Sequence, residues 1–220
     1  MSLVISCLAG KGGVTKTTLA RAISAGLTLA GWEGVGVDSD LGQDSLRSFA
    51  RRREANGITP AIECVALPQV NQIEAAIASD KHDFIVIDGA AYASAITPKL
   101  AALSDLIVIP MRFSVDDMES AVKVGYELMQ EGIGIEKILF VFSGVVHTKA
   151  DEKNARAYLA DTPFNVLPGY IEVKTSYSQA QDVGRSLIET IHPGPRKRAE
   201  DVIQRIIDTA LHNHKQRGSE

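Results

Sequence analysis

The chain has 220 residues, of which 45% are hydrophobic and 23% are charged, and these values exclude global disorder. Lys and Arg number 23 against 27 Asp and Glu, so the formal net charge is −4, which excludes a DNA-packaging role based on bulk positive charge. The two cysteines, Cys7 and Cys64, are too few for a disulfide framework or a four-ligand metal centre, and we expect both to be reduced thiols in the core.

The N-terminal half alternates short apolar runs with segments of helical periodicity. Runs rich in β-branched residues predict strands, and glycines after the last periodic residue predict helix ends. The predicted elements, in chain order, are a strand at Leu3–Leu8, a helix at Lys16–Ala30, a strand at Val35–Val37, a helix at Ser45–Asn56, a strand at Ile62–Leu67, a helix at Pro68–Ala78 and a strand at Phe84–Ile87.

The C-terminal half continues the same alternation. The predicted elements are a helix at Ile96–Leu103, a strand at Leu106–Ile109, a helix at Val115–Gln130, a strand at Ile138–Phe142, a helix at Asp151–Leu159, a short strand near Phe164–Leu167, a helix at Lys174–Val183 and a final helix at about 196–213. Because the final helix carries an apolar stripe, we expect it to pack on the domain. Residues 214–220 are expected to form a flexible tail.

This alternation requires right-handed crossovers between parallel strands. The predicted fold class is therefore α/β, with a single doubly wound, mostly parallel sheet and helices on both faces. No linker divides the chain, so we expect residues 1–220 to form one domain. No stretch approaches the roughly 20 apolar residues of a membrane span, and the first residues have no signal-peptide pattern. We therefore expect a soluble cytoplasmic protein without stable membrane association.

A glycine-rich loop follows the first predicted strand and opens the first predicted helix. It reads Gly10-Lys11-Gly12-Gly13-Val14-Thr15-Lys16-Thr17 and matches the phosphate-binding pattern G-x-x-x-x-G-K-[ST] except at Thr15. Backbone N–H groups of such a loop and of the helix N-terminus bind phosphate oxygens. The pattern predicts that Lys16 reaches the β- and γ-phosphates of ATP and that the Thr17 hydroxyl holds Mg²⁺. We expect residues Gly10 to Thr18 to bind the nucleotide.

A second lysine in the loop narrows this interpretation. The segment Lys11-Gly12-Gly13-Val14-Thr15-Lys16-Thr17-Thr18 resembles the fingerprint K-G-G-x-G-K-[ST]-[ST] of the deviant Walker ATPases. Every fixed position matches except Thr15. The resemblance implies that Lys11 and Lys16 both serve catalysis, with Lys11 reaching across a homodimer to the partner's nucleotide.

Carboxylates follow two of the predicted strands. The segment Asp38-Ser39-Asp40 resembles the family's D-x-D element, and the strand at Phe84–Ile87 runs into Asp88, as in a Walker B element. At the carboxyl ends of parallel strands these side chains would face the ligand crevice. The resemblance implies that Asp40 orients the attacking water, whereas Thr17, Asp38 and Asp88 serve the Mg²⁺ site. After Asp40 the chain continues with Leu41-Gly42-Gln43 instead of the family's Pro-Gln.

Two longer segments are similar to small plasmid-partition ATPases of the ParA type. Residues 83–116 resemble their Walker B strand, the strand that ends in Ile-Pro and the S-x-x-D helix start, and residues 168–189 resemble their C-terminal region. The resemblance implies an ATPase that segregates plasmid or chromosome cargo on the nucleoid by binding nonspecific DNA, with hydrolysis stimulated by a ParB-like centromere-binding adaptor. Because the chain starts at its first strand, we expect no N-terminal helix-turn-helix domain.

Basic residues near the C-terminus are candidates for DNA contact in such a protein. Two tight basic clusters occur, Arg51-Arg52-Arg53 and Arg196-Lys197-Arg198, although such runs usually mark a solvated helix face. The family's preference for C-terminal basic residues favours Lys174, Arg185, Arg196, Lys197, Arg198 and Arg205.

Besides a metabolic ATPase with the same fold, which has the least support, two other functions remain open. One is a membrane-cycling positioning ATPase of the MinD type, which Leu41-Gly42 favours and the polar C-terminal tail disfavours. The other is a slow or non-hydrolysing nucleotide switch, because a β-branched side chain at Thr15 tolerates positive φ poorly and crowds the loop. We expect Thr15 either to relax the loop slightly or to offer its hydroxyl to a phosphate oxygen.

Overall fold

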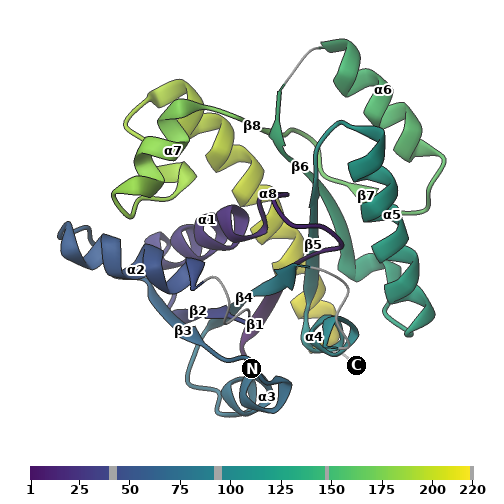
Figure 1. The fold of residues 1–220 in the computed structure, drawn as a ribbon. Coiled ribbons are helices and arrows are strands. Elements are labelled where there is room, and N and C mark those ends of the chain that lie inside the picture. Colours follow the sequence, from purple (N-terminus) through teal and green to yellow (C-terminus); the bar gives the residue numbers. More distant parts are fainter. Residues whose placement is uncertain (40–43, 92–95, 147–148, 219–220) are drawn as a thin grey trace.

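One parallel sheet organises the chain, and helices cover both of its faces (Figure 1). The computed structural model describes residues 1–39, 44–91, 96–146 and 149–218. The sheet order is β3-β2-β4-β1-β5-β6-β7, and β8 pairs with the far end of β6. The strands are β1 (Leu3–Ala9), β2 (Gly34–Asp38), β3 (Glu63–Ala66), β4 (Phe84–Ala91), β5 (Leu106–Met111), β6 (Ile138–Val145), β7 (Asn165–Val166) and β8 (Ile171–Glu172).

The core has two layers because the strands are buried on both faces. One layer lies under α1, α2, α7 and α8, and the other under α3, α4, α5 and α6 (Figure 1). These two layers confirm the predicted doubly wound α/β fold. The helices are α1 (Lys16–Leu29), α2 (Ser45–Ala55), α3 (Val70–Ala78), α4 (Thr97–Leu103), α5 (Val115–Gln130), α6 (Lys149–Ala160), α7 (Thr175–Asp182) and α8 (Pro193–Arg217), with 3₁₀ turns η1 (Ile135–Lys137) and η2 (Leu187–Glu189).

The final helix, α8, packs its apolar stripe against α1. A Cβ at Gly26 of α1 would lie 3.1 Å from the side chain of Ile207 and 3.3 Å from that of Ile203, so glycine allows the two helices to approach closely. The members of the stripe that the core buries are Val202, Ile203, Ile206, Ile207 and Ala210.

The prediction for the C-terminal segment was wrong at both ends of α8. The helix begins at Pro193, because proline fits the first helical turn, and it continues through Arg217. Residues 214–217, predicted to be part of a flexible tail, are therefore helical. Their anchor is the fully buried Asp105, which accepts hydrogen bonds from Arg217 at 3.0 Å and from the backbone N–H of Val4 at 2.8 Å, and which lies 3.0 Å from His214 Nδ1.

Both ends of the described chain lie at the amino-terminal edge of the sheet (Figure 1). The amino group of Met1 pairs with Asp80 at 2.8 Å, and Asp105, which binds the last turn of α8, directly precedes β5. The carboxyl ends of the strands therefore form the opposite edge. No helix within the described ranges has both the length and the apolar character that crossing a bilayer requires.

Candidate functional site

The glycine-rich loop connects β1 to α1 at the carboxyl edge of the sheet and encloses a cavity. The volume of this cavity is about 290 Å³. Gly10 and Lys11 do not line it; they border a much smaller recess against α5. The cavity is lined by Gly12, Gly13, Val14, Thr15, Lys16, Thr17, Thr18, Asp38, Ser45, Asp88 and Gly89. Seven of the nine predicted nucleotide-binding residues therefore share one cavity.

Lys16 and Thr17 begin α1 inside this cavity. The Lys16 side chain is 7% exposed, and its Nζ lies 3.4 Å from the carbonyl oxygen of Lys11. The Thr17 hydroxyl lies close enough to the Asp88 carboxylate to lower the pKa of that carboxyl. Because the first N–H groups of a helix lack partners within the helix, the start of α1 offers donors and a partial positive charge to an anion in the cavity.

Asp38 and Asp88 occupy paired positions at the ends of β2 and β4. Both carboxylates are buried, and Asp38 accepts a hydrogen bond from the backbone N–H of Leu46 at 3.2 Å. Burial raises the pKa of Asp88 to about 6, and the nearby charge of Asp38 adds to this rise, while Thr17 and Lys16 oppose it. Within the described chain, Asp88 Oδ1 is buried without a hydrogen-bond partner.

These side chains fit a magnesium ion that also contacts phosphate. The Thr17 hydroxyl and the two carboxylates supply only oxygen donors, which Mg²⁺ prefers, and the unpartnered Asp88 oxygen would gain a partner. The described residues contain no group of three or more His, Cys, Asp or Glu that could hold a metal without phosphate. Asp40, predicted to orient water, lies outside the described residues, as do Leu41, Gly42 and Gln43.

Thr15 has a left-handed backbone, with φ +66° and ψ +18°. A β-branched residue rarely adopts this conformation, so the strain expected from the sequence is present in the loop. Contact of its hydroxyl with a phosphate oxygen stays a prediction. Thr15 Oγ1 donates a hydrogen bond to Ser143 Oγ of β6 at 2.6 Å, while Thr15 also lines the cavity.

Lys11 extends from the loop to the start of α5. Its Nζ donates a hydrogen bond to the carbonyl oxygen of Asp116 at 2.7 Å and lies 3.7 Å from Asp117 Oδ1. Asp117 also accepts a hydrogen bond from Arg112 at 2.6 Å. Burial raises the pKa of the Asp117 carboxyl, but Arg112, Ser114 and Lys11 together outweigh burial and hold that pKa below its ordinary value.

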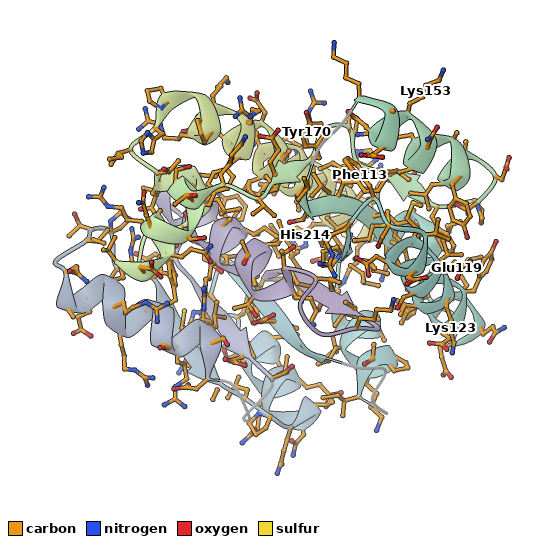
Figure 2. The ribbon with its side chains drawn as sticks, turned by 45° about the horizontal axis from the view of Figure 1, so that its top comes forward. Phe113, Glu119, Lys123, Lys153, Tyr170 and His214 are labelled. Carbon is orange, nitrogen blue, oxygen red and sulfur yellow. The ribbon has the colours of Figure 1, made fainter. Side chains whose placement is uncertain are left out.

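Aromatic side chains support the turn that carries these acidic residues. Phe113 precedes α5 and packs edge-on against Phe142 of β6, with 4.7 Å between ring centroids. Its ring centroid is 6.0 Å from that of Tyr170, which precedes β8, and Figure 2 shows Phe113 and Tyr170 above the carboxyl edge. The turn is thus fixed to β6, the same strand that Thr15 contacts.

The basic residues predicted to bind DNA are largely paired with acids. Arg196 pairs with Glu200 at 3.8 Å, and Lys197 pairs with Asp201 at 2.9 Å. Lys174 at 3.1 Å and Arg198 at 3.5 Å share the carboxylate of Glu172. Arg205 is exposed on α8, while the half-buried Arg185 borders a separate cavity between α7 and η2.

The other basic cluster is only partly solvated. Arg53 is 1% exposed, and its guanidinium pairs with Glu189 at 2.9 Å and donates to the Pro60 carbonyl at 2.7 Å. Arg52 donates a hydrogen bond to the carbonyl of Gln181 at 3.2 Å. The usual meaning of such a run, a solvated helix face, is therefore wrong for Arg53, because the helix turns this side chain toward η2.

Sequence reasoning missed four residues at this edge. Ser45 and Gly89 line the cavity, Ser143 accepts a hydrogen bond from Thr15, and Gly144 leaves space beside the Thr15 methyl group. Ser45 and Gly89 each lie close to a predicted carboxylate in the sequence, so the position of the strand ends could have suggested them. Ser143 and Gly144 carry no such signal, because 128 positions separate Ser143 from Thr15.

Comparison with known proteins adds evidence on the fold. No protein-family model matches the sequence, and no curated protein sequence matches it. The chain is similar to the cell division ATPase MinD of Pyrococcus furiosus, with a TM-score of 0.74 and 20% identity over 94% of this chain and 99% of that one. It is also similar to MinD of Pyrococcus horikoshii complexed with Mg-ADP, with a TM-score of 0.72 and 19% identity over 99% and 98%.

A third similar structure is a ParA family ATPase of Chlorobium tepidum. Its TM-score is 0.71, and its identity is 15% over 96% of this chain and 98% of that one. All three matches extend over nearly the whole of both chains. The chain therefore has the fold of the MinD and ParA ATPases.

Proposed function

We propose that this chain is a ParA-type ATPase that binds ATP and Mg²⁺, forms a nucleotide-sandwich homodimer and moves a plasmid or chromosome cargo over nucleoid DNA. The observation that carries the proposal is the division of the loop lysines between two places. Lys16 lines the cavity, whereas Lys11 lies outside it against Asp116 and Asp117. One lysine would serve the nucleotide of its own subunit and the other that of a second copy.

Nucleotide binding would use the backbone of the loop and the start of α1. Residues Gly12 to Thr18 would surround the phosphates, with Lys16 on the β- and γ-phosphates. Thr17, Asp38 and Asp88 would hold Mg²⁺, which supplies charge neutralisation to the phosphates when it is bound. The complex of the similar Pyrococcus horikoshii MinD with Mg-ADP supports this assignment.

Dimerisation would exchange the contacts of Lys11. In the single chain Lys11 is held by Asp116 and Asp117, and its side chain remains 42% exposed. ATP can favour the dimer only as far as it binds the dimer better than the monomer. A phosphate contact made by Lys11 of the second copy supplies such a difference. Asp40 would then orient the water that attacks the γ-phosphate.

DNA binding would use the basic residues of α8 and the segment before α7. Arg196, Lys197 and Arg198 lie in the first turns of α8, and all three are half-exposed or more. Phosphates of DNA would compete for these cations with the exposed carboxylates of Glu200 and Asp201 and with the less exposed carboxylate of Glu172. For the two exposed carboxylates this exchange has little net electrostatic cost in water. A ParB-like adaptor would stimulate hydrolysis and release the DNA.

A membrane-cycling function has less support. A helix that binds a membrane surface needs an apolar face free to enter the lipid. The apolar stripe of α8 is instead buried against α1 and the sheet. This packing leaves α8 without the free apolar face that binding to a membrane surface would need.

DNA binding measured with ATP, with ADP and without nucleotide tests the proposal directly. We expect binding of an arbitrary duplex with ATP and Mg²⁺ only. A phosphate-release assay and flotation with anionic liposomes are run in parallel. ATP-dependent flotation without DNA binding would favour the MinD-type function, and binding of both ATP and DNA without phosphate release would favour the non-hydrolysing switch. Absence of nucleotide binding would refute all three.

A further inference from the structure

The nucleotide-binding loop has a second attachment point, at the end of β6. Ser143 is fully buried, and its Oγ accepts the hydrogen bond from Thr15 Oγ1 at 2.6 Å. The next residue, Gly144, has φ +69°, and the register of the pairing with β8 shifts between Ser143 and Val145. A shift of this kind re-aims the strand end. This irregular end of β6 is where the strand contacts the nucleotide-binding loop.

Gly144 leaves the space that the Thr15 methyl group occupies. A Cβ built at Gly144 would lie 2.8 Å from Thr15 Cγ2, closer than carbon atoms approach one another. Among the residues that the structure describes, no other atom outside the adjacent residues lies within 4 Å of that Cβ. Glycine at position 144 therefore provides the room that the methyl group of Thr15 takes up.

The contact acts on the strained position of the loop. Thr15 has φ +66°, and a strained backbone persists only when its surroundings hold it in place. The hydrogen bond to Ser143 and the fit against Gly144 hold the side chain toward β6. The hydroxyl is thus committed to Ser143 and the methyl group to the space at Gly144, although Thr15 still lines the cavity where phosphate would bind.

We propose that Ser143 and Gly144 are positioning residues for nucleotide binding, which act through Thr15 to keep the loop open to phosphate. This inference rests on the proposed nucleotide-binding function. It explains how threonine can replace the usual glycine of the motif: the strand end supplies an acceptor for its hydroxyl and a space for its methyl group. The strand residues and Thr15 form one unit, so substitutions at these positions should not be additive.

The test uses Gly144→Ala, alone and combined with Thr15→Ser. Serine keeps the hydroxyl that bonds to Ser143 but lacks the methyl group that the new Cβ would meet. Affinity for ADP with Mg²⁺ is measured by calorimetry, and stability without nucleotide is measured by urea unfolding. Gly132→Ala is the matched control, because Gly132 also has positive φ (+84°) but has open space around its Cβ and lies in the turn after α5.

We expect Gly144→Ala to lower the affinity at least about tenfold, and the double variant to stay within about threefold of Thr15→Ser. Gly132→Ala should lose stability without losing affinity. An equal loss of affinity from Gly144→Ala in the Thr15 and Thr15→Ser backgrounds would overturn the inference. If the wild type fails to bind ADP, the proposed function itself is wrong.

A second variant keeps the test decisive if Gly144→Ala does not fold. Ser143→Ala fits a buried site and removes only the acceptor of the Thr15 hydroxyl. We expect it to lower the affinity about threefold or more and to speed hydrogen exchange of amides 11–17 in the free protein. Unchanged affinity together with unchanged exchange would contradict the positioning role.

Discussion

Lys11 and Asp116 are joined by a hydrogen bond of 2.7 Å from the lysine Nζ to the backbone carbonyl oxygen. The bond draws the first loop lysine away from the cavity that the second loop lysine lines. It therefore predicts different consequences when each lysine is replaced.

Lys11→Ala should leave nucleotide binding by the monomer within about threefold of wild type and should abolish ATP-dependent dimerisation. The physical reason is that Lys11 contacts α5 of its own chain and does not line its own cavity. Calorimetry measures the first effect, and light scattering with ATP and Mg²⁺ measures the second. Equal dimer fractions for wild type and variant would disprove the cross-subunit role.

Lys16→Ala should reduce nucleotide affinity at least about a hundredfold, since a buried phosphate charge would lose its closest cation, at a cost of about 3 kcal/mol. The same titration of Lys99→Ala, an exposed lysine on α4, provides the control. If Lys16→Ala retains wild-type affinity, the cavity under the loop is not a nucleotide site.

Asp40→Ala should slow ATP hydrolysis and preserve the ATP-bound dimer, because the carboxylate is proposed to orient water and not to bind phosphate. Phosphate release and light scattering on the same samples measure both properties. A variant that hydrolyses ATP at the wild-type rate would transfer this role to another residue, and Asp38 would be tested first.

Replacement of Arg196, Lys197 and Arg198 by alanine should weaken DNA binding and its salt dependence. The slope of log affinity against log salt concentration should fall by about 0.9 for each DNA phosphate that the variant no longer neutralises. The matched control replaces Lys123 and Lys153, which are exposed on α5 and α6 over the opposite face of the sheet (Figure 2). An unchanged slope for the α8 variant would show that this cluster does not bind DNA.

Asp117→Asn should change the dependence of stability on pH. Because the folded-state pKa of Asp117 lies below its ordinary value of 3.8, the charged carboxylate stabilises the fold above about pH 4, and this contribution disappears as the pH falls through the folded-state pKa. Arg112 is half-exposed, so we expect a loss of only about 1 kcal/mol at pH 7. Urea unfolding should show a constant difference between wild type and variant above about pH 5, and the two should converge as the pH falls below the ordinary pKa of 3.8 and through the lower folded-state pKa. A difference that persists unchanged below the ordinary pKa would contradict the assignment.

Local patterns are sufficient to predict most of the architecture. The helix at Val115–Gln130 has the predicted bounds, and β1 extends only one residue beyond the prediction. Both follow from contacts between residues close in sequence, namely the helical spacing of apolar residues and a β-branched run. The glycine-rich loop can be predicted equally well from the sequence, since its residues are consecutive and its flanking strand and helix have strong patterns.

Contacts between segments that are distant in the sequence cannot be predicted from local patterns. The pairing of Arg53 with Glu189 converts an apparently solvated arginine into a buried one, and the two residues lie on different helical elements. Strand β8 has only two residues and exists because β6 offers it a partner. The acceptor for Thr15 likewise depends on the position of the end of β6. Such features depend on tertiary packing, which a periodic pattern does not encode.

The contacts of His214 and Arg217, in the last turn of α8, with Asp105 have a practical consequence for labelling. They keep the last described turn of the chain at the same edge of the sheet as the Met1–Asp80 ion pair, across the domain from the cavity. Fluorophores or fusion partners attached at either end would therefore report on the protein without covering the loop.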